Sequence, residues 1–199
     1  METGAYEYRE NAPEEEKKRW KERYEKLSEP VERRQMVYEI RKAARQFAML
    51  YFHFCKTLYD TFGLERTKEL VRQTIFELAV DRSDEMRAKA RAEGVCFDTV
   101  KDFRSVTDLP KCGWIPEWGA DHCPYGQVWR EYAKEYPWFL ELAPYYCDVI
   151  DTTTIENFSR HLSHRLVQNV IISGESCERE YFESEKVREG AFTYGSKND

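Results

Sequence analysis

The hydrophobic positions follow a helical period through the first half of the chain. From Met36 to Phe62, apolar side chains recur at steps of three and four residues, which indicates an amphipathic helix. Gly63 is its natural stop, and a further helix is predicted for residues 64–93, ended by Gly94. Because the connection at Gly63 is short, we expect the two helices to form an antiparallel pair. The first carries Met36, Ile40, Ala43, Phe47, Leu50, Phe54, Leu58 and Phe62, and the second is expected to bury Leu70, Val71, Thr74, Ile75, Leu78 and Ala79.

A more polar segment precedes these helices. Residues 1–10 are predicted to be a loose tail, and Asn11 with Glu14 resembles a capping box, with Pro13 in the first turn. A charged helix should follow to about Leu27, with a thin apolar stripe at Trp20, Tyr24 and Leu27. We therefore expect residues 1–30 to form a tail and a charged helix outside the main domain.

The pattern changes after Gly94. Residues 95–97 are short and apolar and predict a strand, and residues 127–132 alternate in the manner of a second strand. Between them, residues 107–126 are rich in Pro, Gly and Trp, which is typical of an ordered loop over a pocket.

The last part of the chain combines a helix with a hairpin. Pro137 opens a helix, and Pro144 either kinks it or starts a second helix that runs to about Phe158. A β-hairpin is then predicted from residues 162–172, the turn 173–176 and residues 177–183. The whole predicts an α+β fold, in which long N-terminal helices precede a small antiparallel sheet with helices packed on one face. Residues 31–185 would be a single domain, and residues 186–199 a flexible C-terminal tail.

Charge narrows the classes of partner. The net charge is −6 and the isoelectric point is near 5.5, so we expect no nucleic acid. Residues 1–94 hold 20 basic and 19 acidic side chains, and residues 95–199 hold 11 and 18, so the second half carries the negative charge. No apolar run is long enough to cross a membrane, and the polar N-terminus is unlike a signal peptide, so we predict a cytoplasmic protein whose cysteines are thiols. A homo-oligomer is left open.

The side chains suited to chemistry concentrate in the window 121–151. It holds Cys123 and Cys147, two of the six cysteines, together with His122 and two of the five tryptophans. On a helix, Cys147 and Asp151 share one face, as a nucleophile with a proton acceptor or as two metal ligands. The alternative is that Cys147 packs as a small hydrophobic residue and Asp151 caps a neighbouring group.

Other residues of this region are candidates with equally plain alternatives. His122 and Cys123 are adjacent and would face opposite sides of a strand unless Pro124 turns the chain. Arg130 is a candidate clamp for a carboxylate, and it could equally be a solvated surface residue. Tyr125, Trp129 and Tyr146 could wall a ligand pocket or fill the core, and His161 and His164 are expected to be surface residues.

The run 123–129, C-P-Y-G-Q-V-W, resembles the C-P-Y-x-x-x-W segment of the L-2-amino-thiazoline-4-carboxylic acid hydrolase family. The order that follows is also similar, and the resemblance covers roughly residues 36–183. It implies an α+β fold and hydrolysis of a cyclic isothiourea, with 2-amino-Δ2-thiazoline-4-carboxylate opened to N-carbamoyl-cysteine. The matching positions are Tyr146, Cys147, Asp151, Phe158, Gly174 and Cys177.

The leading hypothesis is a cysteine-dependent hydrolase of a small C–N or C–S heterocycle that needs no cofactor or metal. Cys147 or Cys123 would be the nucleophile, and Asp151 or His122 would carry the proton. Substrate would be bound by Arg130 on its carboxylate and by Tyr125, Trp129, Tyr146 and Cys177.

Two other hypotheses remain. The same pocket could bind a small molecule without turning it over, as a sensor or scaffold, because no complete catalytic motif is present. Alternatively, three cysteines with His122 or Asp151 could hold a metal. In each case we expect Cys123 and Cys147 to line one cavity, with Cys177 close by, residues 111–120 closing over it and no disulfide.

Overall fold

The computed structural model describes residues 13–25, 30–108 and 111–183, and the chain divides into two compact units, Met1–Met36 and Val37–Asp199. The first unit contains helix α1 (Glu14–Glu25), which begins after Pro13 as predicted. Three glutamates occupy its first turn, where negative charge is favourable beside the positive end of the helix dipole. The predicted cap residue Asn11, the side chains of the thin apolar stripe and the C-terminal tail lie outside the described part of the chain.

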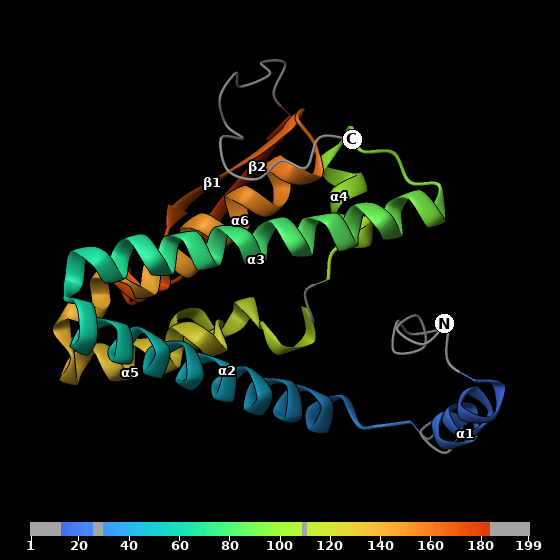
Figure 1. The fold of residues 1–199 in the computed structure, drawn as a ribbon, viewed down its shortest axis with the longest axis horizontal. Coiled ribbons are helices and arrows are strands. Elements are labelled where there is room, and N and C mark those ends of the chain that lie inside the picture. The colour runs from blue at the N-terminus through green and yellow to red at the C-terminus, as the bar shows by residue number, and fades with distance from the viewer. Residues whose placement is uncertain (1–12, 26–29, 109–110, 184–199) are drawn as a thin grey trace. The chain divides into compact units, whose positions relative to one another are not determined.

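Two long helices organise the second unit. Helix α2 (Arg33–Phe62) ends at Gly63, and α3 (Leu64–Glu93) ends at Gly94, so both predicted helices and both stops are confirmed. Gly63 and Gly94 have φ angles of 73° and 68°, which other residues rarely adopt. The helices run in opposite directions, but their ribbons diverge, and the most extensive helix contact is between α3 and α6 (Ala143–Phe158) (Figure 1).

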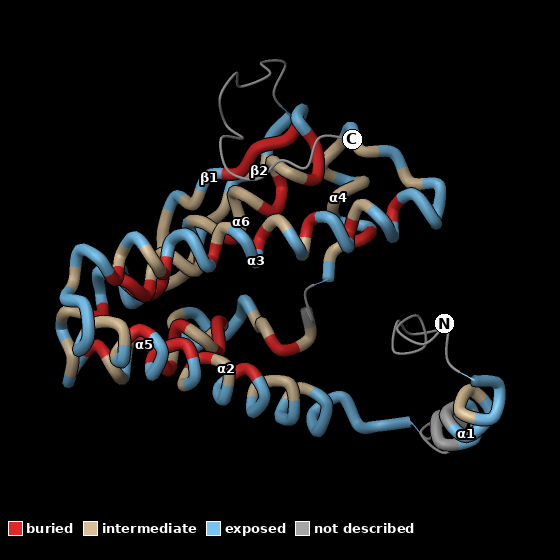
Figure 2. Tube along the Cα trace, viewed as in Figure 1, coloured by how far each residue is buried: buried red, intermediate tan, exposed pale blue. Residues whose placement is uncertain are grey.

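The buried faces of these helices differ from the predicted ones. On α3, the predicted Val71, Ile75 and Ala79 are buried, but Thr74 and Leu78 are exposed. The buried line continues through small residues where α6 approaches closely. On α2, Leu50 and Phe54 are more than half exposed, while alanines, a cysteine and two aromatic residues are buried. Figure 2 shows buried and exposed positions alternating along this helix. The positions of the largest apolar residues therefore do not identify the buried face of a helix where close packing favours small side chains. The buried residues are Ala44, Ala48, Tyr51, Phe52 and Cys55 on α2, and Thr67, Val71, Ile75, Ala79, Ser83, Met86 and Ala90 on α3.

Two predicted strands are absent from the structure. Residues 95–97 form a turn after Gly94, from which Val95 and Phe97 pack on the smaller core, and α4 (Val100–Val106) follows with a Thr99–Asp102 capping box. The predicted strand 127–132 lies inside helix α5 (Pro124–Glu135). The alternation covers only six residues, and the buried Val128, Trp129 and Ala133 follow helical spacing over the longer segment.

Short helices connect these elements. Two 3-10 helices, η2 (Lys111–Gly113) and η3 (Pro116–Asp121), lie within the predicted loop, and Pro137 opens a third, η4 (Pro137–Glu141). Pro144 lies in the first turn of α6, so it starts a new helix, which ends at Phe158 as expected.

The predicted hairpin is confirmed in its pairing, although its connection differs. Strands β1 (Leu162–Gln168) and β2 (Glu178–Glu183) pair antiparallel, with His164 opposite Tyr181. The first strand is shorter than predicted, because the Asn169 side chain accepts the backbone N–H of Ile171 and starts helix α7 (Val170–Ser173). Figure 1 shows α6 between this sheet and α3, so the predicted α+β class is correct.

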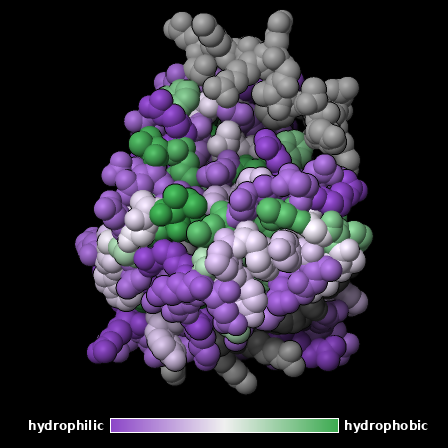
Figure 3. All heavy atoms as spheres, turned by 90° about the vertical axis from the view of Figure 1, so that its left-hand side faces the viewer, coloured by the Kyte–Doolittle hydropathy of each residue, from purple (hydrophilic) through white to green (hydrophobic). Residues whose placement is uncertain are grey.

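Two hydrophobic clusters stabilise the unit. The larger is aromatic and joins α2, α3, α5 and α6 around Phe52 and Trp129, with the Phe52 and Tyr132 rings stacked at 3.8 Å. The smaller joins the last turns of α3 and α6 to α4 and β1 around Met86, Val106 and Phe158. In the face of the molecule drawn in Figure 3, hydrophobic side chains form separate patches among hydrophilic ones.

Burial of Cys55 in the larger cluster predicts a loss of stability in alkali. Burial, opposed by a hydrogen bond with Tyr51, raises the pKa of this thiol from 9.0 to about 12. The unfolded chain therefore ionises first, and the free energy of unfolding should fall as pH rises from about 9 towards 12, by about 1.4 kcal/mol per pH unit for this group. In Cys55→Ala this slope should be shallower in urea unfolding at each pH, whereas the exposed Cys96→Ala should leave it unchanged. Equal slopes in the two variants would contradict the assignment.

Candidate functional site

Three of the cysteines come together where α5, α6 and α7 meet. The Cys123 sulfur caps α5 and lies 3.4 Å from the Gly126 N–H, and the Cys177 sulfur accepts the Val170 N–H at 3.4 Å. A Cβ on Gly126 would lie 2.7 Å from a Val170 methyl, so α5 and α7 are in close contact between these two thiols. Cys147 on α6 belongs to the same buried cluster as Cys123, and Cys177 packs against that cluster.

The thiols of Cys123 and Cys147 are protonated at neutral pH. Burial raises the pKa of Cys147 well above 9.0, and the carboxylate of Asp151 raises it further. Burial also raises the pKa of Cys123, although the Gly126 N–H acts in the opposite direction. A nucleophilic cysteine needs a lowered pKa, and the surroundings of these two thiols act the other way. All six cysteines are free thiols.

His122, one of the two candidate proton carriers, lies at the end of η3. Its Nδ1 donates to the Gly119 carbonyl oxygen at 2.8 Å, so that nitrogen carries the proton. Burial lowers the pKa of His122, and nearby arginines lower it further, which keeps the imidazole neutral with Nε2 as the acceptor.

Arg130 and Trp129 have partners within the protein. Arg130 donates to the Ala120 carbonyl oxygen at 2.8 Å and to the Asp121 carboxylate at 3.0 Å. Trp129 is fully buried, and its indole N–H donates to the Ala48 carbonyl oxygen at 2.9 Å. These contacts attach the segment before α5 to α5 and fix α5 on α2.

Arg41 on α2 was not predicted, and it holds the same segment. It donates to the carbonyl oxygens of Gly113, Asp121 and His122, and its guanidinium lies 4.7 Å from the Trp118 ring centre. Residues 111–122 are thus attached to α2 and α5 by two arginines.

The aromatic candidates Tyr125 and Tyr146 form an edge contact with their ring centres 5.5 Å apart. Burial raises the pKa of both hydroxyl groups, and the charge of Arg82 on α3 lowers both in part. Arg82 therefore connects the two tyrosines electrostatically with a cavity that it also lines.

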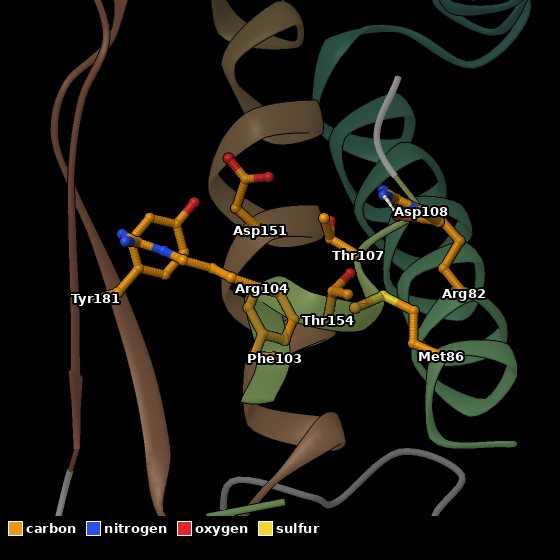
Figure 4. Close-up of a pocket in the computed structure, with 9 residues that line it drawn as sticks. All are labelled: Arg82, Met86, Phe103, Arg104, Thr107, Asp108, Asp151, Thr154 and Tyr181. Atoms are coloured by element: carbon orange, nitrogen blue, oxygen red, sulfur yellow. Dashed lines mark hydrogen bonds and ion pairs between the residues drawn. The ribbon is translucent and has the colours of Figure 1, made fainter. Parts of the chain in front are cut away.

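That cavity has a volume of about 190 Å³ and lies between α3, α4, α6 and β2 (Figure 4). Of the residues predicted from the sequence, only Asp151 lines it. The remainder of the wall combines two arginines and three hydroxyl groups with apolar side chains from the smaller core. The lining residues are Arg82, Met86, Phe103, Arg104, Thr107, Asp108, Asp151, Thr154 and Tyr181.

Two ion pairs neutralise most of the charge in this wall. The Asp151 carboxylate accepts from Arg179 Nε at 2.8 Å, and the Asp108 carboxylate binds Arg82 through two hydrogen bonds of 2.6 and 2.7 Å. Burial lowers the pKa of Arg179, but the charge and hydrogen bond of Asp151 and the neighbouring Cys147 and Cys177 together raise it overall, so the guanidinium stays charged.

Arg104 and Thr154 are left without such partners. The Arg104 guanidinium lies 5.2 Å from the Tyr181 ring centre and forms no ion pair within the described part of the chain. Thr154 is only 4% exposed, and no described residue hydrogen-bonds its hydroxyl. The cavity therefore has one uncompensated positive charge and one unsatisfied buried hydroxyl.

His164 differs from the sequence prediction. It is buried beneath the sheet, not exposed, with Nδ1 3.2 Å from the Thr152 hydroxyl and its ring 5.0 Å from Tyr181. Position 164 points to α6 because β1 alternates from the buried Leu162. Burial lowers its pKa, so a neutral ring supports the Tyr181 side of the cavity.

Sequence reasoning missed most of the cavity, although two signals were present. Arg82 and Ser83 interrupt the apolar face of α3, and the hydroxyl run 152–154 has no counterpart in a purely apolar helix face. Nothing in the sequence indicates that Arg104 and Tyr181 meet, since they lie on elements 77 residues apart in number.

Comparison with known proteins finds no matching protein-family model, curated protein or solved structure. The resemblance drawn from the segment 123–129 thus stays a prediction.

The described residues offer neither a cluster of metal ligands nor a membrane-spanning helix. Within residues 13–25, 30–108 and 111–183, no group of three or more His, Cys, Asp or Glu side chains could hold a metal ion. None of the helices described combines the length and apolar character that crossing a membrane requires.

Because Cys123 and Cys147 are buried and protonated, they should resist alkylation. With iodoacetamide at pH 7.5, mass spectrometry of the native protein should show Cys96 modified first and Cys147 last. Unfolding in urea should remove the difference, which is the internal control. Preferential labelling of native Cys147 would instead identify an activated nucleophile.

Proposed function

We propose that this protein binds a small organic anion, best represented by a monocarboxylate, in the cavity between α3, α4, α6 and β2. The observation that carries the proposal is the Thr154 hydroxyl, which is buried in the wall without a partner among the described residues. A buried hydroxyl without a hydrogen bond is costly, and a ligand oxygen in the cavity would satisfy it.

The charge of the wall supports an anionic ligand. The pairs Arg82–Asp108 and Arg179–Asp151 are each neutral, so Arg104 provides the net positive charge. A guanidinium matches a carboxylate in geometry and charge, and the Tyr181 ring beneath it limits its motion.

The size and the remaining wall favour a short ligand with an apolar body. A volume of about 190 Å³ equals roughly six waters at about 30 Å³ each, which is below the range for drug-sized ligands. Met86 and Phe103 would contact methylene groups, while the hydroxyls of Thr154 and Tyr181 are available to oxygen atoms.

The first test is binding of acetate, butyrate and benzoate, with butyramide as the uncharged counterpart of butyrate. We expect at least one carboxylate to bind in calorimetry and butyramide to bind more weakly. Arg104→Gln should lower carboxylate affinity by roughly tenfold or more, because it removes a charge-assisted hydrogen bond. Thr154→Val, which keeps the shape and removes the hydroxyl, should also weaken binding.

The matched control is Lys101→Gln on the same helix, whose side chain does not line the cavity and which should therefore bind like the unmodified protein. Equal losses in Arg104→Gln and Lys101→Gln would mean that only the general charge matters and would contradict the proposed site. Absence of binding by every carboxylate would refute the proposal itself.

A hydrolase is the second candidate, and one observation favours it. Asp151 lines the cavity and lies one turn of α6 after Cys147, whose thiol faces the neighbouring region where α5 and α7 meet. In this proposal a small heterocycle with C–N and C–S bonds would occupy the cavity, and Cys147 or a water molecule would attack it. The Asp151 carboxylate would accept the proton of the attacking group and pass it to the leaving nitrogen or sulfur.

Assay of 2-amino-Δ2-thiazoline-4-carboxylate opening tests the second candidate directly. Cys147→Ser and Asp151→Asn should each abolish turnover while circular dichroism stays unchanged, and Cys96→Ser should retain it. Full turnover in Cys147→Ser and in Cys123→Ser would exclude covalent catalysis. Ligand recovered intact after long incubation, with no product, would favour binding alone.

A further inference from the structure

Arg82 is a second cation in the wall of the cavity. Its guanidinium is held by both oxygens of Asp108, with Nε to Oδ2 at 2.7 Å and Nη2 to Oδ1 at 2.6 Å. This two-pronged geometry is the one by which arginine recognises the carboxylate of a ligand. Asp108 thus places a carboxylate from the protein itself against a cation that a ligand could use.

The two partners are not equally fixed. Arg82 extends from the middle of α3, and its side chain is 19% exposed, whereas that of Asp108 is 35% exposed and follows the short helix α4. Arg82 is also the only hydrogen-bond partner of the Asp108 side chain within the described part of the chain. Asp108 is therefore the member of the pair that can leave.

The two arginines lie on different sides of the cavity. Figure 4 shows Arg104 beside Tyr181 on one side, Arg82 with Asp108 on the other, and Thr154 between them. Two cations separated by a small cavity with a hydroxyl between them match a ligand with a carboxylate at each end. Asp151, the other acid of the wall, is neutralised by Arg179 and does not compete for either arginine.

We propose that the cavity takes a short dicarboxylate, whose second carboxylate replaces Asp108 on Arg82 while the first lies at Arg104. This inference rests on the proposed binding function and deepens it by naming the ligand class and the residue that regulates entry. Asp108 acts as a tethered competitor, because attachment to the chain gives its carboxylate a high effective concentration at Arg82. Without a ligand, it keeps Arg82 paired.

The decisive experiment compares succinate with butyrate, which have the same four-carbon chain and differ by one carboxylate. Calorimetry on the full chain should show that Asp108→Asn raises succinate affinity by about tenfold or more, since the competitor loses its charge. Butyrate affinity should change little, because its single carboxylate is already placed at Arg104. The matched control is Asp121→Asn, which alters a carboxylate paired with Arg130 and not in the cavity wall, and should leave both affinities unchanged.

A second variant keeps the test independent of how well Asp108→Asn folds. Arg82→Lys preserves the charge but loses the fork, so it should remove the preference for succinate while butyrate still binds.

The outcomes distinguish failure of the dicarboxylate proposal from failure of anion binding in general. Weaker succinate binding in Asp108→Asn would mean that Asp108 positions Arg82, and unchanged binding would mean that it does not compete. Either result would contradict the replacement of Asp108 by a ligand carboxylate. Binding of butyrate would still support the proposed function. If neither acid binds to any of these proteins, the proposed function and this inference fail together.

Discussion

The close contact between α3 and α6 is the constraint on which the other elements of the second unit depend. Small residues, Ala79, Ser83 and Ala90, form the line on α3 that allows the two backbones to approach. Near their ends, Asn157 on α6 donates to Asp84, and Arg87 donates to the Asn157 carbonyl oxygen. Since α6 also carries the sheet, this contact sets the distance between α3 and β2, and hence the width of the cavity.

The same arrangement separates two polar regions that share one helix. Cys147 faces the buried region where α5 and α7 meet, and Asp151 and Thr154 face the cavity near the other end of α6. Between them, Arg82 and Arg179 place positive charge beside thiols, tyrosines and carboxylates. A change of charge in one region therefore acts on the ionisation of the other through these arginines.

Local sequence signals predict the long helices correctly. They do not predict the segments whose structure depends on tertiary contacts. Gly63 and Gly94 end their helices because each needs a positive φ angle, and Pro144 starts α6 because its missing N–H is not needed there. In contrast, residues 127–132 alternate like a strand over a short window, whereas in the fold they belong to a longer helix whose Trp129 is buried against Ala48. The candidate site shows the same limit, since Asp151 was found by its spacing from Cys147, whereas Arg104 and Tyr181 meet only in the folded chain.

The position of Tyr181 has a consequence for how the site is formed during synthesis. One wall of the cavity contains Arg82 on α3. The opposite wall contains Tyr181 on β2, which is synthesised about a hundred residues later. While the intervening residues are being translated, α3 can form and exposes a polar side chain with no completed pocket around it. The contacts that close the cavity join residues far apart in the chain, so their formation carries the entropic cost of closing a large loop. This cost arises before a ligand could stabilise the cavity. A ligand of the proposed kind would therefore bind only after β2 has joined the fold, and would stabilise the completed chain rather than guide the folding of α3.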